Sequence, residues 1–133
     1  MPRKSFIISK IETKSALIDL KKIIIKSDAL LIDRGDLSRY IPIEEIPVAQ
    51  EKVIKIAISE KIPVYVATNL LETMIKENQP TRAESHDIFS TLKQGASGLV
   101  LAAETAVGIN PVGCVKFIKK SINVYKKFKN EKF

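Results

Sequence analysis

Ala29-Leu30-Leu31-Ile32-Asp33 is a short apolar run with charged or turn residues on both sides, and it sets the pattern for the rest of the chain. Three further runs have the same apolar or β-branched character: Ser5 to Ile11, Pro63 to Ala67 and Gly98 to Leu101. Runs of this length and composition are typical of buried strands. The sequence therefore predicts four strands.

Longer stretches with helical spacing separate these runs. Between residues 14 and 26, apolar side chains recur at i, i+1, i+4, i+7 and i+8 from Ala16, with charged residues on the opposite side. The other expected helices run from about Pro47 to Glu60, from Thr81 to Gly95, and from Asn110-Pro111 to about Tyr125. A capping-box sequence begins the third helix, and an N-cap Asn followed by Pro begins the fourth.

Strands and helices thus alternate along the whole chain. Strands that are apolar throughout are typical of parallel sheets covered on both faces. Two architectures remain open, a small open α/β sheet and half of an eight-stranded (β/α) barrel. The length of 133 residues is close to half of the roughly 250 that such a barrel uses, which favours the half barrel. We expect the half barrel over residues 1–125 and a lysine-rich tail over residues 126–133.

The composition excludes several classes of protein. Hydrophobic residues make up 45% and charged residues 28%, which is typical of an ordinary globular domain. The apolar runs are far shorter than the roughly 20 residues of a membrane span, and residues 1–12 do not form a signal peptide, so we expect a cytoplasmic protein without membrane contact. The segment from Lys116 to Phe133 carries a net +6 of the chain's +7. Such a local charge excess favours a solvated helix over nucleic-acid binding.

Polar residues follow each predicted strand, where parallel α/β proteins place their ligands. Lys10 and Glu12 lie on the same side of the first strand by alternation, and Asp36 follows the second strand. Two carboxylates from neighbouring strands suit Mg²⁺, and Lys10 could neutralise an anionic substrate. The alternative is structural: an ion pair between Lys10 and Glu12, and a turn or cap at Gly35 and Asp36.

Five segments occur in a fixed order along the chain. They are residues 9–17 (SKIETKSAL), 34–37 (RGDL), 67–75 (ATNLLETMI), 80–84 (PTRAE) and 104–106 (ETA). Together they resemble successive motifs of the pyruvate kinase family, from about Phe6 to Ile118. The resemblance implies the second half of the catalytic (β/α)₈ barrel, strands five to eight with their helices.

The resemblance also implies roles for individual residues. Lys10 would be the catalytic lysine, and Glu12 and Asp36 the ligands of Mg²⁺ or Mn²⁺. The N–H groups near Gly35 and Asp36, together with Thr68, would hold the carboxylate of phosphoenolpyruvate or pyruvate. Arg34 would support this substrate-binding loop, and Thr68 would also take part in catalysis.

The family's reaction moves a phosphoryl group from phosphoenolpyruvate to ADP. Its potassium ligands and most of its nucleotide contacts lie in the other half of the barrel, so no potassium site is expected here. The sequence departs from the family's pattern at four places, which are Asp33 for a small residue, Asn69 for Gln, Ser38-Arg39-Tyr40 for Gly-x-Glu, and Ala102-Ala103 for Ser-Gly.

A half barrel leaves two unpaired strand edges and an apolar inner face. We expect these surfaces to be covered by a second copy in a homo-oligomer, by a partner chain that completes the barrel, or by the rest of a longer parent protein. Three functions are compatible with the sequence. They are phosphoryl transfer of the pyruvate kinase type, a Mg²⁺-dependent lyase acting on a pyruvate enolate, and a non-catalytic module that binds an oxo-acid or serves in assembly.

Overall fold

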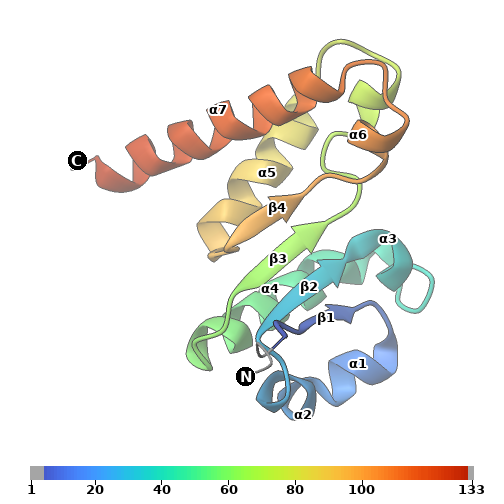
Figure 1. Ribbon diagram of the computed structural model, residues 1–133, viewed down its shortest axis with the longest axis vertical. Helices are drawn as coiled ribbons and strands as arrows, with labels where there is room; N and C mark the ends of the chain where they lie inside the picture. Colours follow the sequence, from blue (N-terminus) through green and yellow to red (C-terminus); the bar gives the residue numbers. More distant parts are fainter. Residues whose placement is uncertain (1–4, 132–133) are drawn as a thin grey trace.

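The structure is a computed structural model that describes residues 5–131. Its sheet contains the four expected strands, β1 (Ile8–Ile11), β2 (Ala29–Asp33), β3 (Val64–Ala67) and β4 (Gly98–Val100). They lie in the order of the sequence, and every neighbouring pair is parallel (Figure 1). The predicted fold class, a partial (β/α) barrel of four parallel strands alternating with helices, is confirmed.

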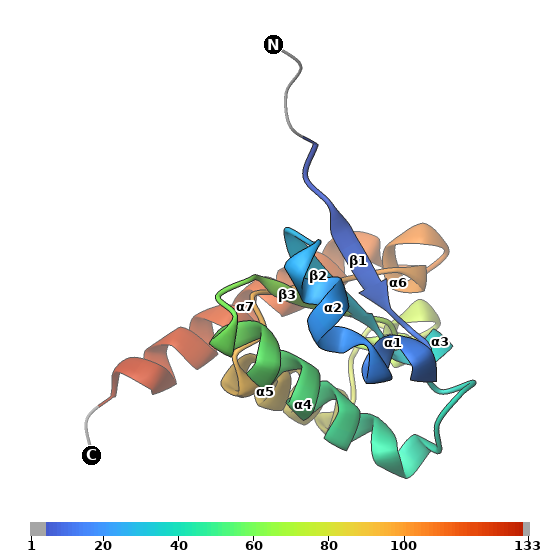
Figure 2. The same ribbon diagram turned by 90° about the horizontal axis from the view of Figure 1, so that it is seen from below.

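Five longer helices connect or follow the strands. They are α1 (Lys14–Ile18), α2 (Leu20–Ile25), α4 (Ile46–Ser59), α5 (Arg82–Gln94) and α7 (Pro111–Asn130). Four short turns of helix lie near strand ends or in loops: α3 (Arg34–Leu37), η1 (Ile43–Glu45), η2 (Glu72–Ile75) and α6 (Ala103–Ala106). The helices α2, α4, α5 and α7 pack next to one another, and α4 lies against β2 and β3 (Figure 2).

Two helices differ from the sequence prediction. The single helix expected over residues 14–26 is interrupted at Asp19, which ends α1 and begins α2 with a backbone ψ of 18°. Helix α7 continues to Asn130, so most of the segment predicted as a tail is helical; residues 132–133 lie outside the described residues. The extension has a packing reason, because the Phe128 ring lies edge-on against Phe89 at 5.2 Å.

The core lies between the sheet and the helices. Alternate residues of β2 and β3, namely Leu30, Ile32, Val64 and Val66, are completely buried on the helix side. Burial of such a branched side chain stabilises the fold by about 1.5–3 kcal/mol. A second cluster under α5 and α7 contains Cys114, the only cysteine of the chain, as a buried apolar residue.

Side-chain caps fix where the later helices begin. Thr81 Oγ1 accepts from Glu84 N–H at 3.1 Å, and Glu84 Oε1 accepts from Thr81 N–H at 2.8 Å, which completes the predicted capping box. Asn110 Oδ1 accepts from Gly113 N–H at 3.0 Å at the start of α7. Gly95 ends α5 with φ 110°, a left-handed conformation that favours glycine.

The opposite face of the sheet carries the site. Strand register places Lys10 beside Leu31, Leu31 beside Tyr65, and Tyr65 beside Gly98. Within residues 5–131, β1 and β4 each pair with one strand only, so both edges of the sheet are open. No helix of this described part combines the length and the apolar character that a membrane span requires.

Candidate active site at the carboxyl ends of the strands

The register of β1 and β2 brings three charged side chains together. Ile11 pairs with Ile32, so the next two residues, Glu12 and Asp33, stand at the same level. Lys10 lies two residues before Glu12 and therefore on the same face of the sheet. Its Nζ is 3.1 Å from Glu12 Oε2 and 3.1 Å from Asp33 Oδ2. The side-by-side placement of Lys10 and Glu12 expected from strand alternation is therefore present.

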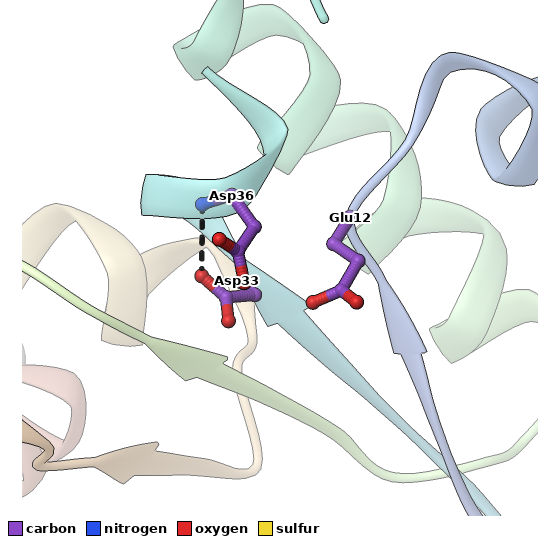
Figure 3. A group of neighbouring side chains, drawn as sticks. All are labelled: Glu12, Asp33 and Asp36. Atoms are coloured by element: carbon purple, nitrogen blue, oxygen red, sulfur yellow. Dashed lines mark hydrogen bonds between the residues drawn. The ribbon is translucent and has the colours of Figure 1, made fainter. Parts of the chain in front are cut away.

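A third carboxylate comes from the short helix that follows β2. Asp33 caps α3, because its Oδ1 accepts from the Asp36 N–H at 3.1 Å, and the turn carries the Asp36 side chain back over the strand end (Figure 3). One carboxylate oxygen from each of Glu12, Asp33 and Asp36 lies within 4.8 Å of the others. The two predicted metal ligands are thus neighbours.

Asp33 was not among the site residues expected from the sequence, although it lies between them. In the sequence it stands out only as a departure from the family's small residue. One signal could have identified it: Asp33 is two residues after Leu31, which the register places beside Lys10, so alternation directs both Asp33 and Lys10 to the same face.

Repulsion among the carboxylates shapes the electrostatics. The Asp33 carboxylate, with a smaller contribution from Glu12, raises the pKa of Asp36. Burial by itself would raise the pKa of Asp33, but the hydrogen bond from Asp36 N–H and the Lys10 ammonium outweigh it and hold that pKa below its ordinary value. Glu12 and then Asp33 raise the pKa of Lys10. Glu12 and Asp33 therefore share the Lys10 ammonium, whereas Asp36 has, within residues 5–131, only a long, exposed pair with Arg39, 3.8 Å from its Oδ1.

Thr68 lies beside this cluster in a strained conformation. It follows β3 with φ 75°, which is unfavourable for a β-branched residue, and Asn69 has φ 59°. The Thr68 Oγ1 accepts from Gly35 N–H at 2.7 Å and lies 3.4 Å from Asp33 Oδ1. Strain of this kind persists where the surrounding structure enforces it, often at functional sites.

The backbone N–H groups of Gly35 and Asp36 both have acceptors within the protein. Gly35 N–H donates to Thr68 Oγ1, and Asp36 N–H donates to Asp33 Oδ1. Both groups that were expected to hold a substrate carboxylate therefore donate within the protein. A side chain at residue 35 would place its Cβ in van der Waals contact, 3.4 Å from Thr68 Oγ1 and 3.4 Å from Asn69 Oδ1.

Arg34 supports the loop from behind. Its guanidinium forms two hydrogen bonds with the Asp87 carboxylate, at 2.7 and 2.9 Å, and two with the Thr68 carbonyl oxygen, at 2.8 and 3.2 Å. The side chain is only 12% exposed. Arg34 thus positions Thr68 and is directed away from the three carboxylates.

A groove of about 360 Å³ runs along these strand ends. Asp33, Asp36 and Thr68 line one part of it, and Ala102, Ala103 and Glu104 line another. Glu104 is 2% exposed, and its carboxylate accepts from Leu71 N–H and Ala102 N–H, both at 2.9 Å. Glu104 therefore ties the end of β4 to the loop after β3.

The donor set fits a hard divalent cation. Carboxylate oxygens are the ligands that Mg²⁺ and Mn²⁺ prefer. Within residues 5–131, Glu12 Oε2 is the buried side-chain oxygen that has no hydrogen-bond donor in good geometry, although the Lys10 ammonium lies 3.1 Å away. A cation between the carboxylates would satisfy this oxygen and relieve the repulsion that raises the pKa of Asp36.

Comparison with known proteins identifies the family. The model for the pyruvate kinase barrel domain matches residues 3–115. The chain belongs to the pyruvate kinase family. It is 49% identical over 114 residues to the pyruvate kinase of Thermotoga maritima, a match that covers 86% of this chain and 24% of the relative. A chloroplastic pyruvate kinase isozyme G of Nicotiana tabacum is 44% identical over 110 residues, or 83% of this chain and 20% of the relative.

A solved structure agrees with this assignment. The crystal structure of a pyruvate kinase from Cryptosporidium parvum superimposes with a TM-score of 0.89 at 39% identity, and it covers 91% of this chain and 25% of that one. The present chain thus spans about a quarter of the length of these pyruvate kinases.

Proposed function

We propose that this chain supplies the metal and keto-acid part of a pyruvate-kinase-type catalytic unit, which transfers a phosphoryl group between phosphoenolpyruvate and ADP. One observation carries the proposal: Lys10, Glu12 and Asp36 meet at one mouth of the sheet, with their charged atoms within reach of a single ion and a small anion. Positioning and charge neutralisation are the main requirements of phosphoryl transfer.

Glu12 and Asp36 are the proposed ligands of Mg²⁺ or Mn²⁺. Such a cation supplies positive charge that stabilises the oxygens of a phosphoryl group or an enolate. Lys10 provides a second positive charge from the neighbouring strand and is the proposed catalytic lysine. No potassium site is assigned to this part of the barrel.

Thr68 is the proposed hydroxyl contact to the substrate, on the far side of Asp33 from Lys10. The Arg34 guanidinium fixes the Thr68 carbonyl, and the Gly35 N–H donates to the Thr68 hydroxyl. Arg34 therefore acts as a positioning residue. A shift of about 1 Å in such a positioned group is sufficient to reduce a rate strongly.

The open edges of β1 and β4 need a partner. We assign them to the remainder of a barrel, supplied by a second copy of this chain, by a separate chain or by a longer parent protein. Ile7 and Ile8 at the first edge are 52% and 48% exposed, and the β4 residues are half-buried. Exposed strand edges of this kind readily pair with another chain.

The test uses oxalate, a small planar dianion that mimics a pyruvate enolate. Calorimetry of the chain with oxalate should show binding with Mn²⁺ or Mg²⁺ and none with EDTA. Glu12→Gln should abolish this binding, and Glu60→Gln, an exposed residue at the end of α4, should leave it unchanged. Metal-independent binding, or binding that survives Glu12→Gln, contradicts the proposal.

A coupled assay with phosphoenolpyruvate and ADP then tests the reaction. Turnover supports phosphoryl transfer. Metal-dependent oxalate binding without turnover, under conditions in which the barrel is complete, contradicts the kinase assignment and leaves a lyase or a binding module that uses the same residues.

A further inference from the structure

Asp33 is the most heavily bonded carboxylate of the site. It is 7% exposed, and both of its oxygens have partners. Oδ2 is 3.1 Å from the Lys10 ammonium, and Oδ1 accepts from the Asp36 N–H at 3.1 Å with the Thr68 hydroxyl 3.4 Å away. One side chain thus holds the ammonium and the N–H of the proposed substrate site, whereas the Thr68 hydroxyl donates to the Ala67 carbonyl oxygen at 2.6 Å.

A carboxylate ligand would bind to the same donors. A bound keto-acid presents a planar carboxylate with two oxygens, the same group that Asp33 presents from within the protein. A substrate carboxylate and the Asp33 carboxylate cannot both take the Lys10 ammonium and the Asp36 N–H without strong repulsion at this distance.

We propose that the Asp33 carboxylate competes with the carboxylate of the substrate for Lys10 and the Asp36 N–H. This inference rests on the proposed function, because it takes the same site as the one that binds a keto-acid. Binding of a small carboxylate then requires Asp33 to give up its bonds, which weakens the affinity for every such ligand. Asp33 thereby selects for ligands with enough charge to displace it.

The geometry favours Asp33 as a competitor of the substrate carboxylate and not as a third metal ligand. The Lys10 ammonium lies against one oxygen of Asp33, and the Asp36 N–H lies against the other. Glu12 differs, since among the described residues the Lys10 ammonium, 3.1 Å from its Oε2, is its one charged partner and no backbone N–H donates to it. Glu12 thus has one oxygen beside the ammonium and the other available for a cation, whereas both Asp33 oxygens have positively polarised partners.

Three variants test the inference. Asp33→Ala removes the carboxylate, Asp33→Asn keeps an acceptor for the Asp36 N–H but releases Lys10, and Asp19→Asn is an exposed control far from the site. Oxalate affinity is measured by calorimetry, once with saturating Mn²⁺ and once with EDTA. Mn²⁺ affinity is measured separately by electron paramagnetic resonance.

We expect Asp33→Ala to bind oxalate about tenfold more tightly than the unmodified chain, the size expected for removing a competitor for a charged hydrogen bond. Asp33→Asn should show a smaller gain, and Asp19→Asn none. If Asp33→Ala fails to fold, the gain for Asp33→Asn carries the test alone. Unchanged or weaker oxalate binding with intact Mn²⁺ binding overturns the inference.

The result also separates this inference from the proposed function. If the unmodified chain binds no Mn²⁺, the proposed function is wrong, while tighter oxalate binding by Asp33→Ala in EDTA still supports competition at Lys10. If Asp33→Ala loses Mn²⁺ affinity as completely as Glu12→Gln, Asp33 is a metal ligand and the competitor role is overturned.

Discussion

Two groups of carboxylates lie at the same end of the sheet, and they differ in their partners. Glu104, at the end of β4, is almost completely buried and accepts two backbone N–H bonds. At the ends of β1 and β2, Glu12 and Asp33 share the Lys10 ammonium, Asp33 accepts one N–H, and Asp36 has only a long pair with Arg39 in the described part of the chain. The comparison shows that the hydrogen-bond donors around a carboxylate decide its role. A carboxylate with its own N–H donors holds the fold together, and a group short of donors is suited to a cation.

Glu104→Ala should have the largest effect of the variants that test this comparison. The change leaves the N–H groups of Leu71 and Ala102 without acceptors and opens a cavity, so we expect a loss of about 3 kcal/mol in the free energy of unfolding. Urea denaturation at fixed protein concentration measures it. Glu72→Ala, an exposed neighbour in η2, is the control and should change stability by less than about 0.5 kcal/mol. Equal effects of the two variants would contradict a structural role for Glu104.

Arg34→Lys tests the connection between the two groups. Lysine cannot reproduce the forked bonds to Asp87 and the Thr68 carbonyl, so the free energy of unfolding should fall by about 2 kcal/mol. Arg39→Lys is the matched control, because its pair with Asp36 is exposed and long at 3.8 Å. A double-mutant cycle with Asp87→Asn should give a coupling energy of about 1 kcal/mol. A coupling energy of zero would show that the Arg34–Asp87 hydrogen bonds do not hold the Thr68 loop.

Glu84→Ala extends the comparison to a second carboxylate that has its own N–H donors. Burial by itself would raise the pKa of Glu84, but the N–H groups of Thr73 and Thr81 outweigh it and lower that pKa. Its stabilisation is therefore present above the ordinary pKa of 4.5 and is lost as the pH falls through the lower pKa of the folded state. At pH 7, Glu84→Ala should cost about 1 kcal/mol in urea denaturation. The difference in free energy of unfolding between Glu84→Ala and the unmodified chain should become smaller below pH 4.5. The control Glu77→Ala should show no such pH dependence. A constant gap would contradict the role of the ionised carboxylate.

Asp36→Asn should have the smallest effect and the opposite sign. It removes one of three repelling carboxylates from a half-buried position, so without divalent cations the urea midpoint should rise slightly with an unchanged m-value. Asp19→Asn, exposed and away from the cluster, should not raise the midpoint. A lower midpoint for Asp36→Asn would mean that the cluster stabilises the metal-free fold.

The sequence predicts most of the fold because the signals are local. Apolar runs such as residues 29–33, the capping box at Thr81 and the Asn110 cap each depend on a few neighbouring residues. Alternation along β1 likewise places Lys10 beside Glu12. The Asp33 contacts depend on strand register and on the turn of α3. The hydrogen bonds between Arg34 and Asp87 join residues that are 53 positions apart, so no local pattern contains them.

The most direct test of the central claim is a titration of the chain with Mn²⁺ followed by electron paramagnetic resonance. The account predicts one saturable Mn²⁺ site per chain. Glu12→Gln should weaken this site by about tenfold or more, and Glu60→Gln should leave it unchanged. A folded chain without saturable Mn²⁺ binding, or equal Mn²⁺ affinity for Glu12→Gln and the unmodified chain, would contradict the claim that these carboxylates form a cation site.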